Sequence, residues 1–288
     1  MLCRVRQVSR SAYYAWRAKR ERAIETEGVF QAKQVKDCFE EHRRRYGSRR
    51  ITAELKSRGI EIGRYKIRRL MREQNLVASS SKKFKPKPTD SGHNALVSPN
   101  LLKQNANQPN AAGQVIVGDI TYLAMANGKW CYLAIWQDKF TRRIVGWAVS
   151  ERMTAGLVVK ALEMGLRQGL IESGAIIHTD RGSQYVADIY RNLLKRYGLR
   201  QSMSGKGNCY DNAQAESFFS RFKAELVEDG IFEDVETARA ESFDYIECYY
   251  NRKRRHSGIG YKIPMEFEKE LKIEKQRRKN ESFVSYLT

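Results

Sequence analysis

The chain has 288 residues, of which 41% are hydrophobic and 30% charged, so it has room for about two folded units and is too apolar to be a disordered chain. No apolar run approaches the roughly 18 residues that cross a bilayer, and the first residues lack the apolar core of a signal peptide, so we expect neither a membrane-spanning nor a secreted protein. The 53 lysines and arginines outnumber the 33 acids, and the net charge of +20 favours a polyanionic partner, above all nucleic acid.

The placement of charges and cysteines narrows the class of protein further. Residues 1–110 hold 26 basic and 10 acidic residues, whereas residues 111–288 hold 27 and 23. This difference predicts a basic arm followed by a nearly balanced body. The five cysteines are scattered, form no CxxC pair and make no zinc signature with the four histidines, which favours reduced thiols in a cytosol.

The first 75 residues have apolar positions three or four apart, the spacing of short helices. We expect four of them: one that Ser9 or Ser11 caps, one from about 29 to 44 that ends at Tyr46-Gly47, one that begins at Ser48, and one from about 64 to 74. The last two are separated by a tight turn that contains glycine. They therefore predict a helix-turn-helix.

Arginines lie away from the apolar positions of the last of these helices, where they can reach bases or phosphates of a major groove. A second basic cluster lies just before the preceding helix. The alternative is a basic helix that only faces solvent. The candidate DNA-binding residues are Arg64, Arg68, Arg69, Arg72, Arg49 and Arg50.

Periodicity disappears between the arm and the body. Residues 79–110 are rich in Ser, Lys, Pro and Asn, the composition of a linker. Its lysines can follow a phosphate backbone, although a charged flexible tether has the same composition.

From Gln114 onward the pattern changes to strands. Three β-rich runs, 114–124, 129–138 and 142–151, follow one another, and Asn127-Gly128 between the first two is a strong hairpin signal. Short strands and helices then alternate, which predicts an α/β sheet of mixed direction with helices on its faces. The expected strands are 175–178 and 199–202, and the expected helices 154–169, 183–197, 211–227 and 235–250.

Three acids occupy positions that this layout brings together. Asp119 lies in the first strand, Asp180 directly follows the fourth, and Glu216 lies in the first turns of a helix. Carboxylates gathered in this way repel one another unless a cation neutralises them, and an all-oxygen site suits Mg²⁺ or Mn²⁺. Two such ions support phosphoryl displacement, the chemistry of nucleases and strand transfer. Taken singly, each acid is as well explained by a strand end, a turn cap or a helix surface.

The motifs around the acids have a family resemblance. The segments GDITYLA, HTDRGSQY and GNCYDNAQAESFF surround the acids, with 61 positions from Asp119 to Asp180 and 35 residues between Asp180 and Glu216. With YGSRRI in the arm and YNRKRRHSGIGYKIPMEF near the end, the chain resembles the DDE transposase and retroviral integrase superfamily. It is most similar to the second-reading-frame transposase of the insertion-sequence-three family of bacterial mobile elements.

The resemblance implies an RNase H-like core, with Asp119, Asp180 and Glu216 as catalytic residues and ligands of two divalent ions. It implies a reaction in which water cuts a strand at the element's end and the exposed 3′-hydroxyl attacks another phosphodiester, without a covalent protein intermediate. It also implies DNA as partner, a homo-oligomer of at least two chains, possible joining to a first-reading-frame protein, and a bacterial cytoplasmic location near the nucleoid. The alternatives are a metal-dependent nuclease without strand transfer and a DNA-binding regulator without catalysis.

Further residues near the acids have two interpretations each. Lys223 matches a lysine seven positions after the glutamate in the integrase pattern and shares its helix face, but lysines on helices are usually only solvated. Asn212 can contact DNA or begin the helix, and Lys206 lies in a glycine-rich turn that permits close approach to a DNA backbone. We expect a hydrogen-bonding role for His178 and a turn role for Asp138.

The domain boundaries follow from these elements. We expect a basic helical DNA-binding region at 1–78, a linker at 79–110, an integrase-type core at 111–235 and a helical, basic extension at 236–288. In the extension, the residues Tyr249, Asn251, Arg254 and His256 either contact DNA or pack against the core.

Overall fold

The structure is a computed structural model that describes residue 6 and residues 8–79, 97–205, 213–226 and 231–287. It divides into two compact units, Met1–Ser79 and Ser80–Thr288. Within the described ranges, no helix combines the length and the apolar character that a membrane crossing requires.

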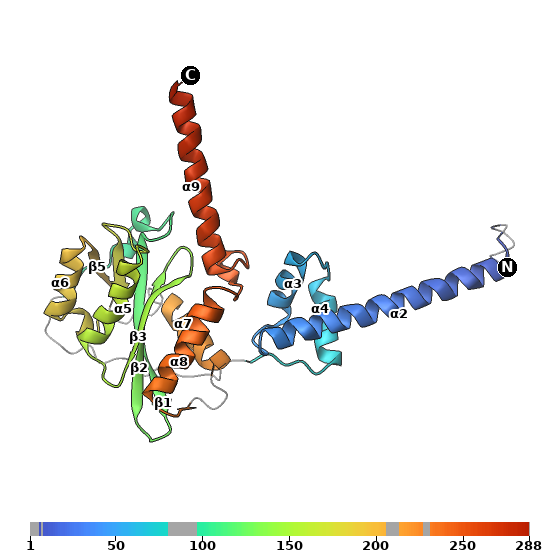
Figure 1. The fold of residues 1–288 in the computed structure, drawn as a ribbon, viewed down its shortest axis with the longest axis horizontal. Helices are drawn as coiled ribbons and strands as arrows, with labels where there is room; N and C mark the ends of the chain where they lie inside the picture. The colour runs from blue at the N-terminus through green and yellow to red at the C-terminus, as the bar shows by residue number, and fades with distance from the viewer. Residues whose placement is uncertain (1–5, 7, 80–96, 206–212, 227–230, 288) are drawn as a thin grey trace. The chain divides into compact units, whose positions relative to one another are not determined.

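The first unit contains α2 (Arg10–Glu41), α3 (Ser48–Ser57) and α4 (Arg64–Glu73) (Figure 1). The predicted cap is confirmed, because Ser9 Oγ accepts a hydrogen bond from the Ala12 N–H at 3.5 Å. The prediction of two helices before residue 45 is wrong, since α2 is one continuous helix of 32 residues. Gly28 lies inside it, and a single glycine weakens a helix without breaking it.

The second half of α2 packs against α3 and α4, and this packing forms the core of the unit. The chain turns after Glu41, where Arg43 and Arg44 have φ angles of 50° and 59°, so α2 ends earlier than the predicted Tyr46-Gly47. The predicted starts of the next two helices are confirmed. The buried apolar residues of this core include Val35, Cys38, Phe39, Ile51, Leu55, Ile67 and Leu70.

The second unit is built on a mixed sheet with the strand order β3-β2-β1-β4-β5. Strands β1 (Val115–Met125), β2 (Trp130–Asp138) and β3 (Ile144–Ser150) form the predicted antiparallel meander. Strands β4 (Ile176–Thr179) and β5 (Arg200–Met203) add to it in parallel. This is the RNase H-like arrangement that we expected. The two-residue strand β6 (Ile231–Phe232), which pairs with the end of β1, was not predicted because it is too short for a pattern.

Helices cover both faces of the sheet (Figure 1). One face carries α5 (Ala155–Arg167) and α6 (Asp188–Arg196), and the other carries α7 (Ala213–Leu226) and α8 (Val235–Phe243). The π-helical η5 (Asp244–Tyr250) continues α8, so the predicted helix 235–250 is confirmed in extent but changes its winding. The last helix is α9 (Pro264–Leu287).

The end of the expected linker belongs to the sheet unit. Residues 97–110 include the 3₁₀ turns η1 (Leu101–Lys103) and η2 (Asn105–Asn107). Leu102 packs on Val115 and Ile176 at the junction of β1 and β4, and the Leu101 N–H donates to Ser202 Oγ at 3.0 Å. Two leucines are too few to show periodicity, which is why sequence composition alone placed them in a linker. Residues 80–96 lie outside the described part of the chain.

Candidate active site

Asp119 and Asp180 are brought to one edge by two neighbouring parallel strands. Val117 in β1 pairs with His178 in β4, and each aspartate lies two positions further along its own chain. Residues two apart in a strand share a face, and neighbouring strands lie roughly 4.8 Å apart. The register therefore places the two aspartates side by side where β4 ends.

Glu216 comes from the helix that covers β1. It lies in the first turn of α7, whose inner face carries the buried Phe218 and Phe222. Glu216 is exposed and has no hydrogen bond or ion pair with any described residue. Its charge nevertheless acts on Asp119, so the helix brings the third carboxylate within electrostatic range of the strand.

The electrostatics of the three acids show that they converge. Burial first, then the negative charge of Asp180 and, more weakly, that of Glu216 raise the pKa of Asp119 to about 8, although the Ile120 N–H donates to its Oδ1 at 2.8 Å. Burial also raises the pKa of Asp180, against the Gly182 N–H that donates to Oδ1 at 2.9 Å, and the pKa of Glu216. Without a cation, Asp119 therefore keeps its proton at neutral pH.

The chemistry of this donor set fits a hard divalent cation. All three side chains offer carboxylate oxygen, which Mg²⁺ and Mn²⁺ prefer, and a cation removes the repulsion that raises the pKa of Asp119. In the described part of the chain, no three such side chains are drawn together tightly enough to hold a metal ion as they stand. The acids thus converge without being closed around an ion.

A wedge of buried aromatic rings supports the aspartates from the other face of the sheet. A Cβ atom added to Gly118 would lie 2.2 Å from Trp136 Cζ3, so only glycine lets this indole lie across β1 next to Asp119. Tyr185, in the 3₁₀ turn η3 (Ser183–Tyr185) after Asp180, meets the indole edge to face with centroids 6.1 Å apart. Sequence analysis missed this support, although Gly118 and Tyr185 both lie in the motifs around the acids.

Two neighbouring polar residues have the roles expected from sequence. His178 Nδ1 is 2.8 Å from Ser202 Oγ, a hydrogen bond between β4 and β5. The buried carboxylate of Asp138 accepts hydrogen bonds from the backbone N–H groups of Gly113, Phe140 and Thr141, so it fixes the turn after β2.

The other candidates around the acids are only partly described. Lys223 lies on α7 seven residues after Glu216, on the same face; its side chain is largely exposed, and desolvation lowers its pKa. Lys206, Asn212 and Asp211 fall outside the described residues.

The opposite face of α7 is anchored by a buried ion pair. Arg254 is 2% exposed, and it donates from Nε and from a terminal nitrogen to the two carboxylate oxygens of Glu225, at 2.8 and 2.6 Å. The Tyr245 hydroxyl donates to the same carboxylate at 2.9 Å. Asn251 is fully buried and exchanges two hydrogen bonds of 3.0 Å with the backbone of Ile144. Arg254 and Asn251 are therefore packing residues, which decides between the two roles that sequence left open.

The arginines of the first unit lie on its surface. Arg64, Arg68, Arg69 and Arg72 are exposed on α4, opposite the buried Ile67, Leu70 and Met71. Among the described residues, only Arg69 of these four has an acidic partner, Glu73 at 3.5 Å. In the second cluster, Arg49 is exposed and Arg50 lies over the Tyr46 ring at 5.8 Å.

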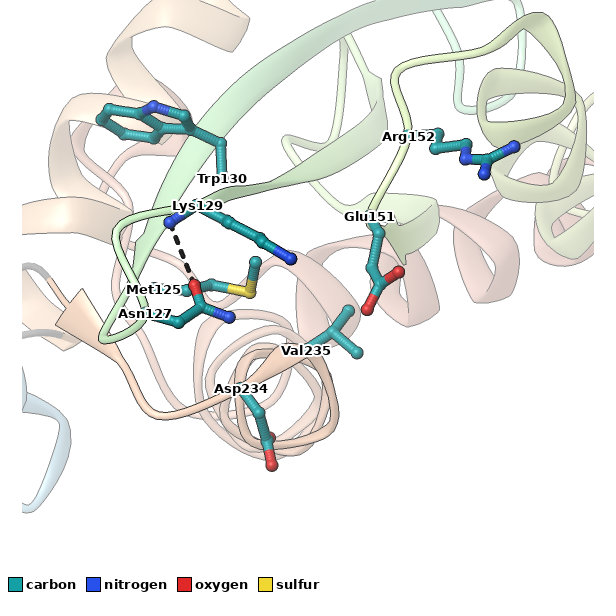
Figure 2. Close-up of a pocket in the computed structure, with 8 residues that line it drawn as sticks. All are labelled: Met125, Asn127, Lys129, Trp130, Glu151, Arg152, Asp234 and Val235. Carbon is teal, nitrogen blue, oxygen red and sulfur yellow. Dashed lines mark hydrogen bonds between the residues drawn. The ribbon is translucent and has the colours of Figure 1, made fainter.

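A surface pocket of about 230 Å³ lies away from the acids (Figure 2). It is formed at the β1–β2 hairpin, where Asn127 Oδ1 accepts from the Lys129 N–H at 3.0 Å, and at the start of α8 (Figure 2). Met125 of this pocket is six residues along β1 from Asp119, or roughly 20 Å at the rise of a strand. The pocket is therefore not part of the candidate active site.

Comparison with solved structures finds similarity to retroviral integrase cores. The catalytic core domain of BIV integrase matches 57% of this chain and 99% of its own, at 20% identity and a TM-score of 0.41. The HTLV-2 integrase catalytic core domain in complex with magnesium matches 56% of this chain and 98% of its own, at 12% identity and a TM-score of 0.40.

Comparison of sequences gives much closer matches. The family described as "Integrase core domain" matches residues 109–209 and, in a second part, 216–271, and an "HTH-like domain" matches residues 30–84. The Escherichia coli K12 "Transposase InsF for insertion sequence IS3A" is 43% identical over 272 residues, 93% of this chain and 92% of that protein. A Shigella sonnei protein, "Insertion element IS600 uncharacterized 31 kDa protein", is 43% identical over 92% of this chain and 97% of its own. The chain belongs to the IS3 family of insertion-sequence transposases, with an HTH-like domain followed by an integrase core.

Proposed function

We propose that this transposase uses Asp119, Asp180 and Glu216 as catalytic carboxylates for metal-dependent DNA strand cleavage and 3′-hydroxyl strand transfer. One observation carries the proposal: Asp119 is acted on by two other carboxylates, and no cationic side chain is among the causes of its raised pKa in the described residues. Structural acids of this protein have cationic or N–H partners. A carboxylate trio without them is suited to hold cations.

The residues have separate tasks in this reaction. Two Mg²⁺ or Mn²⁺ ions, when bound, would activate the attacking oxygen and stabilise the leaving oxygen of an in-line phosphoryl displacement. Asp119 and Asp180, on neighbouring strands, would give up any proton and hold the ions on a rigid base, while Glu216 would approach from α7. Lys223, on the same helix face as Glu216, would contact a DNA phosphate beside the acids.

We propose that the first unit binds DNA. The support is the exposed arginine face of α4 and the adjacent cluster of Arg49 and Arg50. Lys206 and Asn212 would add contacts next to the acids. In this division, residues 1–78 bind DNA, 79–110 connect, 111–235 catalyse and 236–288 extend the core.

The reaction at two element ends requires at least two chains, so we propose a homo-oligomer on DNA that contains the terminal inverted repeats and the target. A first-reading-frame protein of the same element would be a further partner. The chain would act in the bacterial cytoplasm, at the nucleoid.

The test uses labelled oligonucleotides with the element's end sequence, an unlabelled target duplex and Mg²⁺ or Mn²⁺. We expect cut ends and joined products with the natural chain, and neither with Asp119→Asn, which keeps DNA binding. Cut ends without joined products would support a nuclease instead. Specific binding without any cutting would support a regulator.

A further inference from the structure

Two buried tyrosines beneath the site have hydroxyls without hydrogen-bond partners. Tyr185 is 2% and Tyr190 0% exposed, and neither hydroxyl has a partner among the described residues. Their rings meet edge to face at 5.6 Å, and both contact Trp136, at 6.1 Å each. Buried polar groups in folded proteins are almost always hydrogen-bonded, so an unpartnered hydroxyl calls for a functional explanation.

The two hydroxyls differ in what surrounds them. The negative charges of Asp180 and Asp119 both act on the phenol of Tyr185, and raise its pKa beyond what burial does, whereas burial alone raises the pKa of Tyr190. Geometry explains the difference. A Cβ atom at Gly182 would lie 3.1 Å from Asp180 Oδ1 and 3.5 Å from Tyr185 Cδ2, so the carboxylate and the ring edge are close neighbours on either side of this glycine.

The backbone holds Tyr185 in this place. Its N–H donates to the Gly182 carbonyl at 3.0 Å, and its carbonyl accepts from Gln201 Nε2 in β5 at 2.6 Å. The ring is packed against Trp136, which itself lies across β1 at Gly118, next to Asp119. The hydroxyl is thus fixed near both aspartates by the loop, by β5 and by the aromatic wedge.

We propose that Tyr185 is a positioning residue of the active site, whose hydroxyl donates a hydrogen bond to the Asp119–Asp180 carboxylate pair when these carboxylates are ionised for cation binding. The inference rests on the proposed function of the two aspartates. A phenol can donate one hydrogen bond to a carboxylate, and a hydrogen bond to a charged acceptor is stronger than one between neutral groups. Its effect would be to orient the carboxylate oxygens, as outer residues do in other metal sites.

The test compares Tyr185→Phe with Tyr190→Phe in the full chain. Each variant removes one buried hydroxyl from the same aromatic cluster and keeps the ring. The first measurement is the melting temperature without metal, and the second is the Mn²⁺ concentration that gives half of the Mn²⁺-induced rise in melting temperature. The third is cleavage of a labelled element end as a function of Mn²⁺ concentration. Asp119→Asn serves as the reference without a functional site.

We expect both phenylalanine variants to melt like the natural chain without metal, because neither loses a hydrogen bond. Tyr185→Phe should need roughly tenfold more Mn²⁺ for the thermal response and for cleavage, the size of effect seen for outer residues of metal sites. Tyr190→Phe should need no more than the natural chain.

Three results would overturn the inference or its basis. If Tyr185→Phe responds to Mn²⁺ like Tyr190→Phe, while Asp119→Asn is inert, the role of Tyr185 is refuted and the proposed function stands. A large loss of melting temperature in Tyr185→Phe without metal would assign the hydroxyl a structural partner, and would also refute the role. If Asp119→Asn keeps both the Mn²⁺ response and cleavage, the proposed function itself fails.

Discussion

The two faces of α7 present glutamates in opposite surroundings. Glu225 and Glu216 are nine residues apart, which is about two and a half helical turns, so they point in opposite directions. Glu225 is buried and has a bidentate arginine and a tyrosine hydroxyl as partners, whereas Glu216 has no partner among the described residues and adds its charge to that of the two aspartates. The protein thus neutralises the acids that hold it together and leaves uncompensated those that we assign to catalysis.

The largest expected effect is at the compensated end. Arg254→Ala removes one partner of a buried pair and leaves the Glu225 carboxylate without its countercharge. We expect the free energy of unfolding to fall by about 3–5 kcal/mol. Urea denaturation of the metal-free chain measures it.

The matched control is Arg252→Ala, two residues away in the same basic segment but exposed. Its effect on the unfolding free energy should stay within about 0.5 kcal/mol. Equal effects of the two substitutions would mean that the ion pair does not anchor α7, and the contrast between the two faces would lose its stability argument.

A smaller effect of opposite sign is expected at the uncompensated end. Asp119→Asn removes a carboxylate that burial and two neighbouring charges disfavour. One pKa unit corresponds to about 1.4 kcal/mol, so we expect the metal-free chain at pH 7 to gain on the order of 1–3 kcal/mol in unfolding free energy while cleavage is abolished.

Asp138→Asn is the control for this substitution. Asp138 is also a buried aspartate of the same sheet, but its carboxylate accepts backbone N–H groups from three residues. An amide has a single acceptor oxygen, so we expect a loss of about 1–3 kcal/mol in urea denaturation. A loss of stability in both variants would show that Asp119 is a structural acid.

The pH dependence of stability gives a third, weaker contrast. The pKa of Asp119 is about 8 in the folded chain and about 3.9 when unfolded, so the folded state holds the proton more tightly between these values. Stability from this group is present below about pH 4 and is lost as pH rises through about 8. Melting temperatures of the metal-free chain should therefore fall over this range more steeply than those of Asp119→Asn. Parallel curves would contradict the raised pKa.

Local patterns in the sequence predicted the sheet and the convergence of its acids, and long-range packing explains what they missed. The Asn127-Gly128 turn and the alternation around it correctly gave the first three strands. The position of Asp180 directly after β4 was enough to place it beside Asp119, because strand ends share an edge. The pairing of Arg254 with Glu225 joins residues 29 apart by burial, which no periodicity reveals. The continuity of α2 was missed because Gly28 was given more weight than the helical residues on either side.

The smallest expected effect extends the same contrast to DNA binding. Arg68 is exposed on α4 and has no acidic partner among the described residues, whereas Arg239 on α8 is paired with Glu236. If uncompensated cations of the first unit neutralise phosphates, Arg68→Ala should reduce the slope of log K against log salt concentration by about 1. Arg239→Ala should leave the slope unchanged, because this guanidinium already has an anionic partner. Fluorescence anisotropy with an element-end duplex at several salt concentrations measures both slopes. Equal slopes for the two variants would exclude α4 as a phosphate-binding surface, and the division between compensated and uncompensated charge would then hold for the acids alone.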